Sequence, residues 1–107
     1  MISTVGPYAR YGTPLVESAI RQGTHYVDLT GETPWVRSLI DRLHGEAEAK
    51  GVKIVPSCGY DSIPSDLGAW FAARELQRRY PGCRVGRISC LVAEGKGGFS
   101  GGTIESG

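Results

Sequence analysis

Three short polar segments contain the residue types with the clearest capacity for chemistry. They are Gly6-Pro7-Tyr8, Thr30-Gly31-Glu32 and the stretch 58–62, which reads Cys-Gly-Tyr-Asp-Ser. Each segment places a glycine, which lets a ligand approach the backbone closely, beside a tyrosine or a carboxylate. If the fold brings the segments together they predict one cleft, and otherwise they are three separate solvent-exposed loops. The residues expected to line such a cleft are Tyr8, Tyr11, Glu32, Tyr60 and Asp61.

Each polar segment follows an apolar run of strand length and precedes a helical pattern. The runs at 2–5, 26–29 and 52–55 predict strands. Thr13-Pro14 and Thr33-Pro34 each offer a capping hydroxyl followed by a first-turn proline, so we expect helices to begin there. The strand–helix alternation predicts an α/β fold with a Rossmann-like parallel sheet and flanking helices. Because parallel strands all end at one edge, this fold would bring the three segments together.

The third expected helix, about 65–80, differs from the other two. Its first half, 67–73, is almost entirely apolar, which predicts burial on more than one side. Asp66 and Asp61 could form a carboxylate pair for acid–base chemistry. Asp66 lies at the expected start of the helix, however, where a carboxylate caps backbone N–H groups, and we favour that capping role.

The pattern changes again after Pro81-Gly82. A fourth strand is predicted at about 85–93, where apolar and polar residues alternate as in a half-exposed sheet. A glycine-rich stretch follows at 95–102. We therefore expect a second structural unit to begin at residue 83, and this unit is too short to bury a sheet face alone.

Length, charge and cysteine content bear on whether the chain is a membrane, metal-binding or nucleic-acid-binding protein. The chain has 107 residues, a net charge of +1 and no apolar run of the roughly 20 residues that a membrane span needs. These features predict one small cytoplasmic domain with no membrane span. The three cysteines lack the paired spacing of a zinc site, so we expect free thiols and no metal. Five arginines between 74 and 87 could bind phosphate, but without interleaved aromatic residues they predict no nucleic acid partner.

The sequence lacks the motifs that hold a nucleotide. Neither G-x-G-x-x-G nor G-x-x-x-x-G-K-[ST] occurs in the chain. A glycine-rich turn before a helix N-terminus normally binds the pyrophosphate of a dinucleotide. The chain by itself is therefore not expected to hold a pyrophosphate in the usual way.

Several ordered motifs nevertheless resemble one enzyme family. The stretches Val5-Gly6-Pro7-Tyr8, 23–32 and 57–68, together with Gly101-Gly102-Thr103, resemble the saccharopine dehydrogenase-like oxidoreductases, including the trans-acting enoyl reductase branch. The resemblance implies an internal fragment that lacks the N-terminal dinucleotide fingerprint. Residues 1–82 would form the C-terminal half of a Rossmann-type dinucleotide-binding domain. Residues 83–107 would begin an incomplete α+β domain for substrate binding and dimerisation.

The resemblance also implies an activity, which is hydride transfer between NAD or NADP and a small or lipid-like substrate. It identifies no catalytic residue, and it implies a homo-oligomer. The alternative is a truncated, non-catalytic α/β module that self-associates. In the family the first loop passes near the nicotinamide and the third lies at the cleft between domains, so the residues implied in cofactor binding are Val5, Gly6, Pro7, Tyr8, Gly59, Tyr60 and Asp61.

Overall fold

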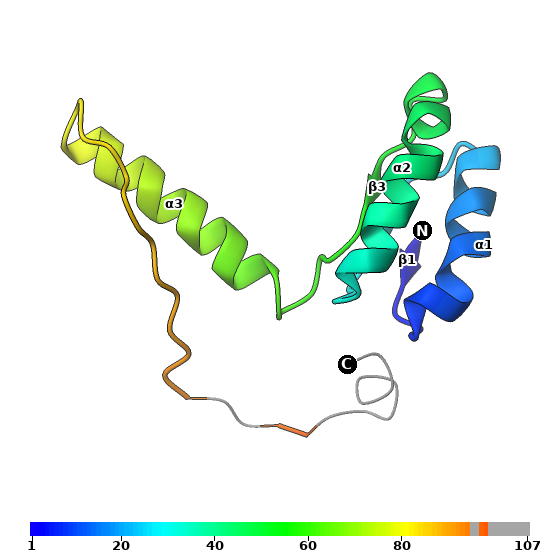
Figure 1. The fold of residues 1–107 in the computed structure, drawn as a ribbon, viewed down its shortest axis with the longest axis horizontal. Coiled ribbons are helices and arrows are strands. Elements are labelled where there is room, and N and C mark those ends of the chain that lie inside the picture. The colour runs from blue at the N-terminus through cyan, green and yellow to red at the C-terminus, as the bar shows by residue number, and fades with distance from the viewer. Residues whose placement is uncertain (95–96, 99–107) are drawn as a thin grey trace.

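Three parallel strands, arranged in chain order, form a small sheet (Figure 1). The structure is a computed structural model that describes residues 1–94 and 97–98. Strand β1 spans Ile2–Ser3, β2 spans Tyr26–Asp28 and β3 spans Ile54–Val55. Each lies within a predicted strand, and both pairings are parallel. The α/β class and the parallel sheet predicted from the sequence are therefore confirmed.

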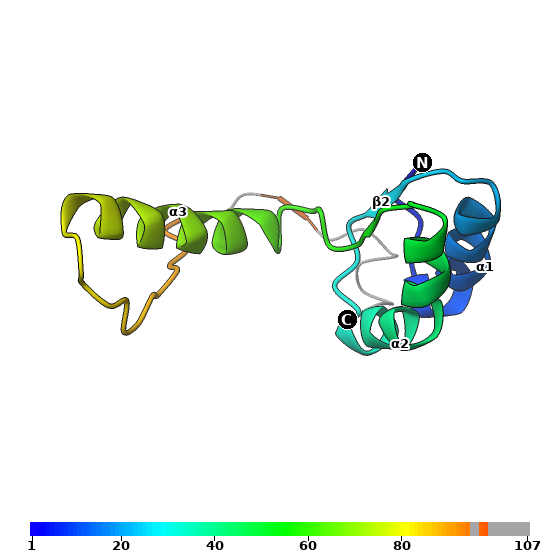
Figure 2. The same ribbon diagram turned by 90° about the horizontal axis from the view of Figure 1, so that it is seen from above.

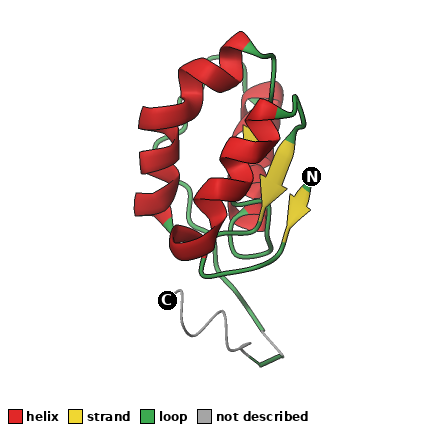
Figure 3. Cartoon of the chain, turned by 90° about the vertical axis from the view of Figure 1, so that its right-hand side faces the viewer, coloured by secondary structure: helices red, strands yellow, loops and turns green. Residues whose placement is uncertain are grey.

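Helices α1 (Tyr8–Arg21) and α2 (Thr33–Ala49) lie side by side over one face of this sheet (Figure 3). Each helix connects one strand to the next, which is the arrangement that parallel pairing requires. Apolar side chains of the two helices pack against the sheet and against each other. The buried apolar residues are Tyr8, Val16, Ala19, Ile20, Tyr26, Trp35, Leu39, Ala47 and Val52.

The opposite face of the sheet has no helix over it in the described part of the chain. Ile2 pairs with Val27 and Val27 pairs with Val55, so these three side chains share one face. Ile2 and Val55 are exposed, whereas Ser3, Tyr26 and Asp28 on the helix-covered face are buried. The sheet is therefore covered on one side, with its core between the sheet and the helix pair.

The start of α1 differs from the prediction. Thr13-Pro14 does not begin the helix, because α1 starts at Tyr8 and Pro14 lies inside it. The first backbone N–H groups of α1 bind the Glu32 carboxylate, which is distant in sequence. A local capping signal cannot reveal such a long-range partner. The Thr33-Pro34 signal was correct, since α2 starts at Thr33.

Helix α3 (Ile63–Arg79) extends away from the sheet and the other two helices (Figure 2). It contains no buried residue. Leu67, Trp70 and Phe71 are 52%, 56% and 64% exposed, so the predicted burial of 67–73 is wrong for this chain. Asp66 lies in the first turn, but no side chain caps the helix, and the predicted cap is also wrong. The carboxylate still faces the positive end of the helix dipole.

Residues 83–94 form no strand, and the predicted fourth strand at 85–93 is wrong. A strand needs a hydrogen-bonded partner, and no other described segment pairs with these residues. The Gly101-Gly102-Thr103 segment lies outside the described residues, and the domain boundary at 82/83 remains a prediction. Every helix in the described part of the chain is too short or too polar to cross a bilayer.

Candidate functional edge of the sheet

The carboxyl ends of the three strands bring together the loops 4–7, 29–32 and 56–62, as predicted from the sequence. Hydrogen bonds connect the second loop to the start of α1, directly after the first loop, and to the third loop. We call this region the loop edge. Its geometry depends on two carboxylates, Glu32 and Asp28, which have different partners.

Glu32 connects the second loop to the start of α1. Its Oε1 accepts a hydrogen bond from the Tyr8 N–H at 2.7 Å, and its Oε2 accepts one from the Ala9 N–H at 2.7 Å. The Glu32 N–H in turn donates to Thr30 Oγ1 at 3.0 Å. Glu32 therefore satisfies two N–H groups that a helix start leaves open, and its charge complements the helix dipole. The predicted cleft carboxylate is a helix cap.

Asp28 connects the second loop to the third. Its buried carboxylate accepts hydrogen bonds from the Tyr26 hydroxyl at 2.9 Å, the Thr30 N–H at 3.1 Å and the Ser57 N–H at 2.9 Å. Burial and the hydrogen bond to Asp28 raise the pKa of Tyr26, so the tyrosine keeps its proton. Three donors around one carboxylate compensate for the cost of burying its charge.

Ser57 turns the chain out of the sheet. Its φ of 61° lies in the left-handed region, which is uncommon for a residue with a Cβ. Two hydrogen bonds hold it there, one from its N–H to Asp28 Oδ1 and one from its hydroxyl to the Thr30 carbonyl at 2.8 Å. The Cys58 N–H also donates to the Asp28 carbonyl at 2.7 Å. The third loop therefore leaves the sheet in a fixed direction.

Tyr8 has its side chain in the core. It is 4% exposed, and its ring stacks on Trp35 with the ring centroids 5.7 Å apart. Its hydroxyl donates to the Ser3 carbonyl at 3.3 Å, and burial raises its pKa. The prediction that the Tyr8 side chain lines a cleft is therefore wrong. Only the backbone of Tyr8 can contribute at the loop edge.

The rest of the first loop remains accessible. Val5 is exposed, while Gly6 and Pro7 are half-buried. A Cβ added to Gly6 would meet the Tyr8 ring at 3.5 Å, which is an ordinary contact distance. Gly6 therefore has no steric requirement for glycine within the described part of the chain. Its assigned role near a cofactor remains a prediction.

The third loop packs on the second. A Cβ on Gly59 would lie 2.9 Å from the Leu29 Cβ, so glycine is required for this close approach. The Asp61 carboxylate lies beside both Gly59 and Gly31. Tyr60 is 79% exposed at the end of the loop. Tyr60 and Asp61 are thus the accessible polar side chains that the third loop adds to the loop edge.

Tyr11 is placed differently from the prediction for a cleft residue. It lies on α1, half exposed, with the Arg10 guanidinium 5.1 Å from the centre of its ring. This is a cation–π contact at the surface of the helix. Asp61 lies in the third loop and Asp66 lies in the first turn of α3, and the carboxylate pair remains a prediction.

One helix start at the loop edge is already occupied by a carboxylate. The α1 N-terminus would be the natural place for an anion, but its Tyr8 and Ala9 N–H groups already bind Glu32. The exposed backbone around Val5 and Gly6 and the third-loop residues Tyr60 and Asp61 remain accessible. Within the described residues no cluster of metal-ligating side chains occurs, and Cys58, Cys83 and Cys90 are free thiols.

Sequence reasoning missed the residues that hold the loops together. Asp28, Thr30 and Ser57 form the connections, and none was predicted as a site residue. One signal was available. Asp28 is a charged residue within a strand, and it alternates with Tyr26 so that both face the helices. A buried carboxylate on a strand end requires donors, and the neighbouring loops are the nearest source.

Comparison with known proteins gives a consistent set of relatives. No protein-family model matches the chain, and no solved structure matches it. The chain is similar to mycobacterial trans-acting enoyl reductases. It is 46% identical over 106 residues to one from Mycobacterium tuberculosis, which covers 99% of this chain and 25% of that protein. It is 47% identical over 88 residues to one from Mycobacterium leprae, covering 82% of this chain and 20% of that protein.

A third relative extends the pattern. The trans-acting enoyl reductase of Mycobacterium bovis is 50% identical over 79 residues, which cover 74% of this chain and 18% of that protein. The chain therefore spans no more than a quarter of the length of these relatives. The similarity supports the enoyl reductase branch of the resemblance drawn from the sequence.

Proposed function

We propose that this chain forms the nicotinamide-facing edge of an NAD- or NADP-dependent oxidoreductase that reduces an enoyl group. The observation that carries the proposal is the loop edge, where hydrogen bonds hold three loops at the carboxyl ends of parallel strands. Ligands of open parallel sheets bind at this edge. The names of the mycobacterial relatives support the reductase class and supply the enoyl substrate.

Residues of the first and third loops are assigned the contacts with the cofactor. Val5, Gly6, Pro7 and the Tyr8 backbone would pack against the nicotinamide ring, because this stretch is accessible and carries no charge. Gly59, Tyr60 and Asp61 would border the ring from the third loop. When bound, the cofactor supplies the hydride, and the protein supplies its orientation and the exclusion of water.

The pyrophosphate of the cofactor requires another part of the protein. Because Glu32 occupies the α1 N-terminus, this helix start is not free to bind the phosphates. In this proposal the sheet is one half of a Rossmann-like domain, residues 83–107 begin a substrate and dimerisation domain, and a further segment binds the phosphates. The 18–25% of each relative's length that the chain matches fits such a division.

A chimera tests the proposal directly. The matched 106 residues of the M. tuberculosis relative would be replaced by this chain, and cofactor oxidation with an enoyl thioester would be followed by absorbance. We expect the chimera to retain reductase activity. Gly6→Val should reduce cofactor affinity by roughly tenfold or more, because a branched side chain would enter the space of the nicotinamide ring.

Asp66→Asn is the matched control, since Asp66 lies outside the loop edge and its substitution should leave cofactor affinity unchanged. The isolated chain should show no saturable binding of NADH or NADPH at low micromolar concentration. A folded chimera in which Gly6→Val binds cofactor as tightly as the parent would contradict the assignment of the first loop.

A second candidate function is a non-catalytic module that self-associates. The exposed apolar residues of α3 favour it, because a soluble helix rarely leaves Leu67, Trp70 and Phe71 uncovered together. An inactive but folded chimera would favour this candidate over the oxidoreductase.

A further inference from the structure

An apolar groove lies between α2 and β3, and Val16 of α1 also contributes to its lining. Its volume is about 380 Å³, and its floor is formed by one flank of α2 together with β3. The apolar residues that define its length are Val36, Ile40, Leu43, Ala47, Val52 and Ile54. Most of the groove is formed by α2 and the edge strand β3, and it meets the loop edge at Pro56.

Helix α3 carries an apolar stripe of matching character. Ile63, Leu67, Trp70 and Phe71 recur at helical spacing on one side, and the last three are more than half exposed. Arg74 continues the same side, with its guanidinium 5.1 Å from the centre of the Trp70 ring. The stripe therefore combines a large apolar surface with one cation at its C-terminal end.

The groove and the stripe also match in length and direction. From Val36 to Glu48 the groove follows α2 for about 18 Å, and from Ile63 to Arg74 the stripe extends for about 16 Å, at 1.5 Å per residue. In a right-handed parallel α/β unit, successive helices run in the same direction and lie next to one another. A helix placed beside α2 in this manner would cover the edge strand β3.

The charges fit this parallel placement. Glu48, His44 and Lys53 lie at the end of the groove where α2 finishes, and Glu48 is the carboxylate among them. With Ile63 near Val36, Arg74 would reach the end that holds Glu48. The carboxylate nearest to Arg74 within α3, Glu75, already binds Arg78 and Arg79. Arg74 and Glu48 are thus complementary across the interface.

The connection between β3 and α3 keeps the helix away from its own groove. Ser57 and Cys58 are fixed by hydrogen bonds to Asp28 and Thr30. The Gly59 carbonyl then accepts hydrogen bonds from the Ser62 and Ile63 N–H groups, which sets the start of α3. The helix therefore points away from α2, as Figure 2 shows, and does not cover the groove.

We propose that α3 of a second copy of this chain occupies the groove between α2 and β3, and that the two copies exchange their α3 helices reciprocally. Each groove would receive Leu67, Trp70 and Phe71 of the other copy, with Arg74 beside Glu48. Such an exchange buries the same surfaces twice and closes into a symmetric dimer. The proposal concerns assembly and holds whether or not the chain takes part in the proposed reduction.

Sedimentation of the full chain across a concentration series, with a reducing agent to keep its thiols free, tests the dimer. We expect a monomer–dimer equilibrium at micromolar concentrations. Leu67→Asp on the helix and Ile40→Asp in the groove should each weaken dimerisation roughly tenfold or more. Leu76→Asp is the matched control, because Leu76 lies on the other side of α3, and it should leave dimerisation unchanged.

A charge exchange tests the orientation. Arg74→Glu and Glu48→Arg should each weaken dimerisation roughly two- to fivefold, and the double variant should restore it. Circular dichroism and thermal unfolding of every variant would verify that the chain remains folded. Both single variants lie on exposed positions, so they are not expected to disturb the core.

Three outcomes would overturn the proposal. One is a monomer at every concentration, including a monomer in which Trp70 emission shows burial, since that would place α3 in its own groove. Another is a dimer that resists both Leu67→Asp and Ile40→Asp, which would assign the contact to a different surface, such as the open face of the sheet. The third is a folded double charge variant that dimerises no better than either single variant.

Discussion

The unit formed by residues 1–55 and helix α3 use apolar residues in opposite ways. In the first unit, two helices bury nine apolar residues against each other and the sheet. Helix α3 buries no residue, although its segment 67–73 is almost entirely apolar. A hydrophobic pattern therefore indicates that a helix face is suited to packing. Whether that face packs against the same chain depends on the direction in which the preceding loop leaves the sheet.

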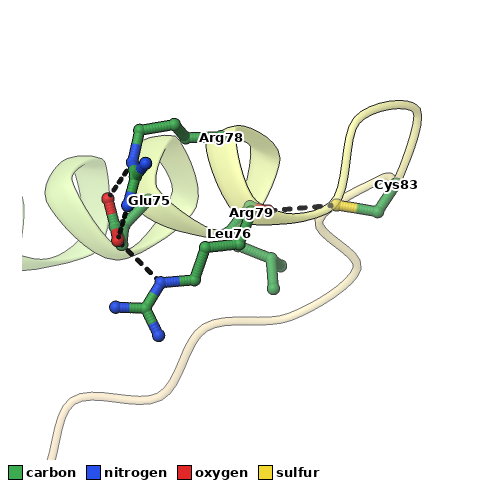
Figure 4. A network of polar contacts seen from close by, with 5 residues as sticks. All are labelled: Glu75, Leu76, Arg78, Arg79 and Cys83. Carbon is green, nitrogen blue, oxygen red and sulfur yellow. Dashed lines mark hydrogen bonds and ion pairs between the residues drawn. The ribbon is translucent and has the colours of Figure 1, made fainter.

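Polar contacts show the same contrast. In the first unit, Glu32 and Asp28 accept hydrogen bonds from residues more than twenty positions away. In α3, Glu75 binds Arg78 and Arg79 one turn further along the same helix (Figure 4). We therefore expect the first unit to unfold cooperatively, whereas the side-chain ion pairs of α3 among the described residues are local.

Removal of the Asp28 carboxylate should break the first unit and have the largest effect. Asp28→Ala leaves the Tyr26 hydroxyl and the Thr30 and Ser57 N–H groups without their acceptor, so we expect a loss of about 3 kcal/mol or more in the free energy of unfolding. Urea unfolding measures this change. Asp61→Ala, an exposed carboxylate in the same region, should cost within about 0.5 kcal/mol. Equal losses would show that Asp28 does not hold the loops.

A glycine-to-alanine substitution should change stability in opposite directions in the two regions. A Cβ at Gly12 in α1 would lie 2.5 Å from Trp35 Cζ2, and the Trp35 ring is fixed by Tyr8 and by its hydrogen bond to Thr13. Gly12→Ala should therefore destabilise the first unit by about 1–3 kcal/mol.

The same change at Gly68 in α3 meets no atom within 4 Å. Gly68→Ala should stabilise the helix by about 0.5–1 kcal/mol, because alanine loses less backbone entropy. The gain should appear as helicity by circular dichroism at low protein concentration, with the main unfolding midpoint unchanged. A shifted midpoint would show that α3 is part of the cooperative unit.

Alkaline pH should weaken the first unit selectively. The pKa of Tyr26 is raised in the folded protein by burial and by the hydrogen bond to Asp28. Its contribution to stability is therefore fully present below the unfolded pKa of about 10 and is lost as the pH rises above that value. The free energy of unfolding should fall by up to about 1.4 kcal/mol per pH unit there. Tyr26→Phe should make this decline shallower, and an unaltered slope would contradict the role of Tyr26.

The sequence predicted the fold class because its signals are local. Three strands and three helices were predicted in the correct order. The signals were the apolar runs, the Thr33-Pro34 pair and the helix-terminal glycines Gly23 and Gly51, both of which have positive φ. The start of α1 was wrong because its cap, Glu32, is distant in sequence. The fourth strand was wrong because alternation predicts a strand only where a partner strand is present.

The location of the candidate site could be predicted from the sequence, but the hydrogen bonds that connect its loops could not. Parallel pairing requires the three loops to meet, so residues 6–8, 30–32 and 58–62 could be placed together from the sequence. The partners of individual side chains could not be predicted. The Tyr8 side chain lies in the core, where it stacks on Trp35, and the Glu32 carboxylate caps α1. Both contacts depend on the relative positions of the helices, which no local sequence pattern specifies.

The smallest expected effect is a change in the helicity of α3 when Glu75 is protonated at acidic pH. The hydrogen bonds from Arg78 and then Arg79 lower the pKa of Glu75. The contribution of the Glu75 carboxylate to helix stability is present above its unfolded pKa of about 4.3 and is lost as the pH falls below that value. Acidification should thus reduce the helicity of the wild type slightly more than that of Glu75→Gln, measured by circular dichroism at 222 nm. High salt should diminish the difference, because exposed ion pairs are screened. A large loss of global stability in Glu75→Gln would instead mean that α3 is coupled to the first unit.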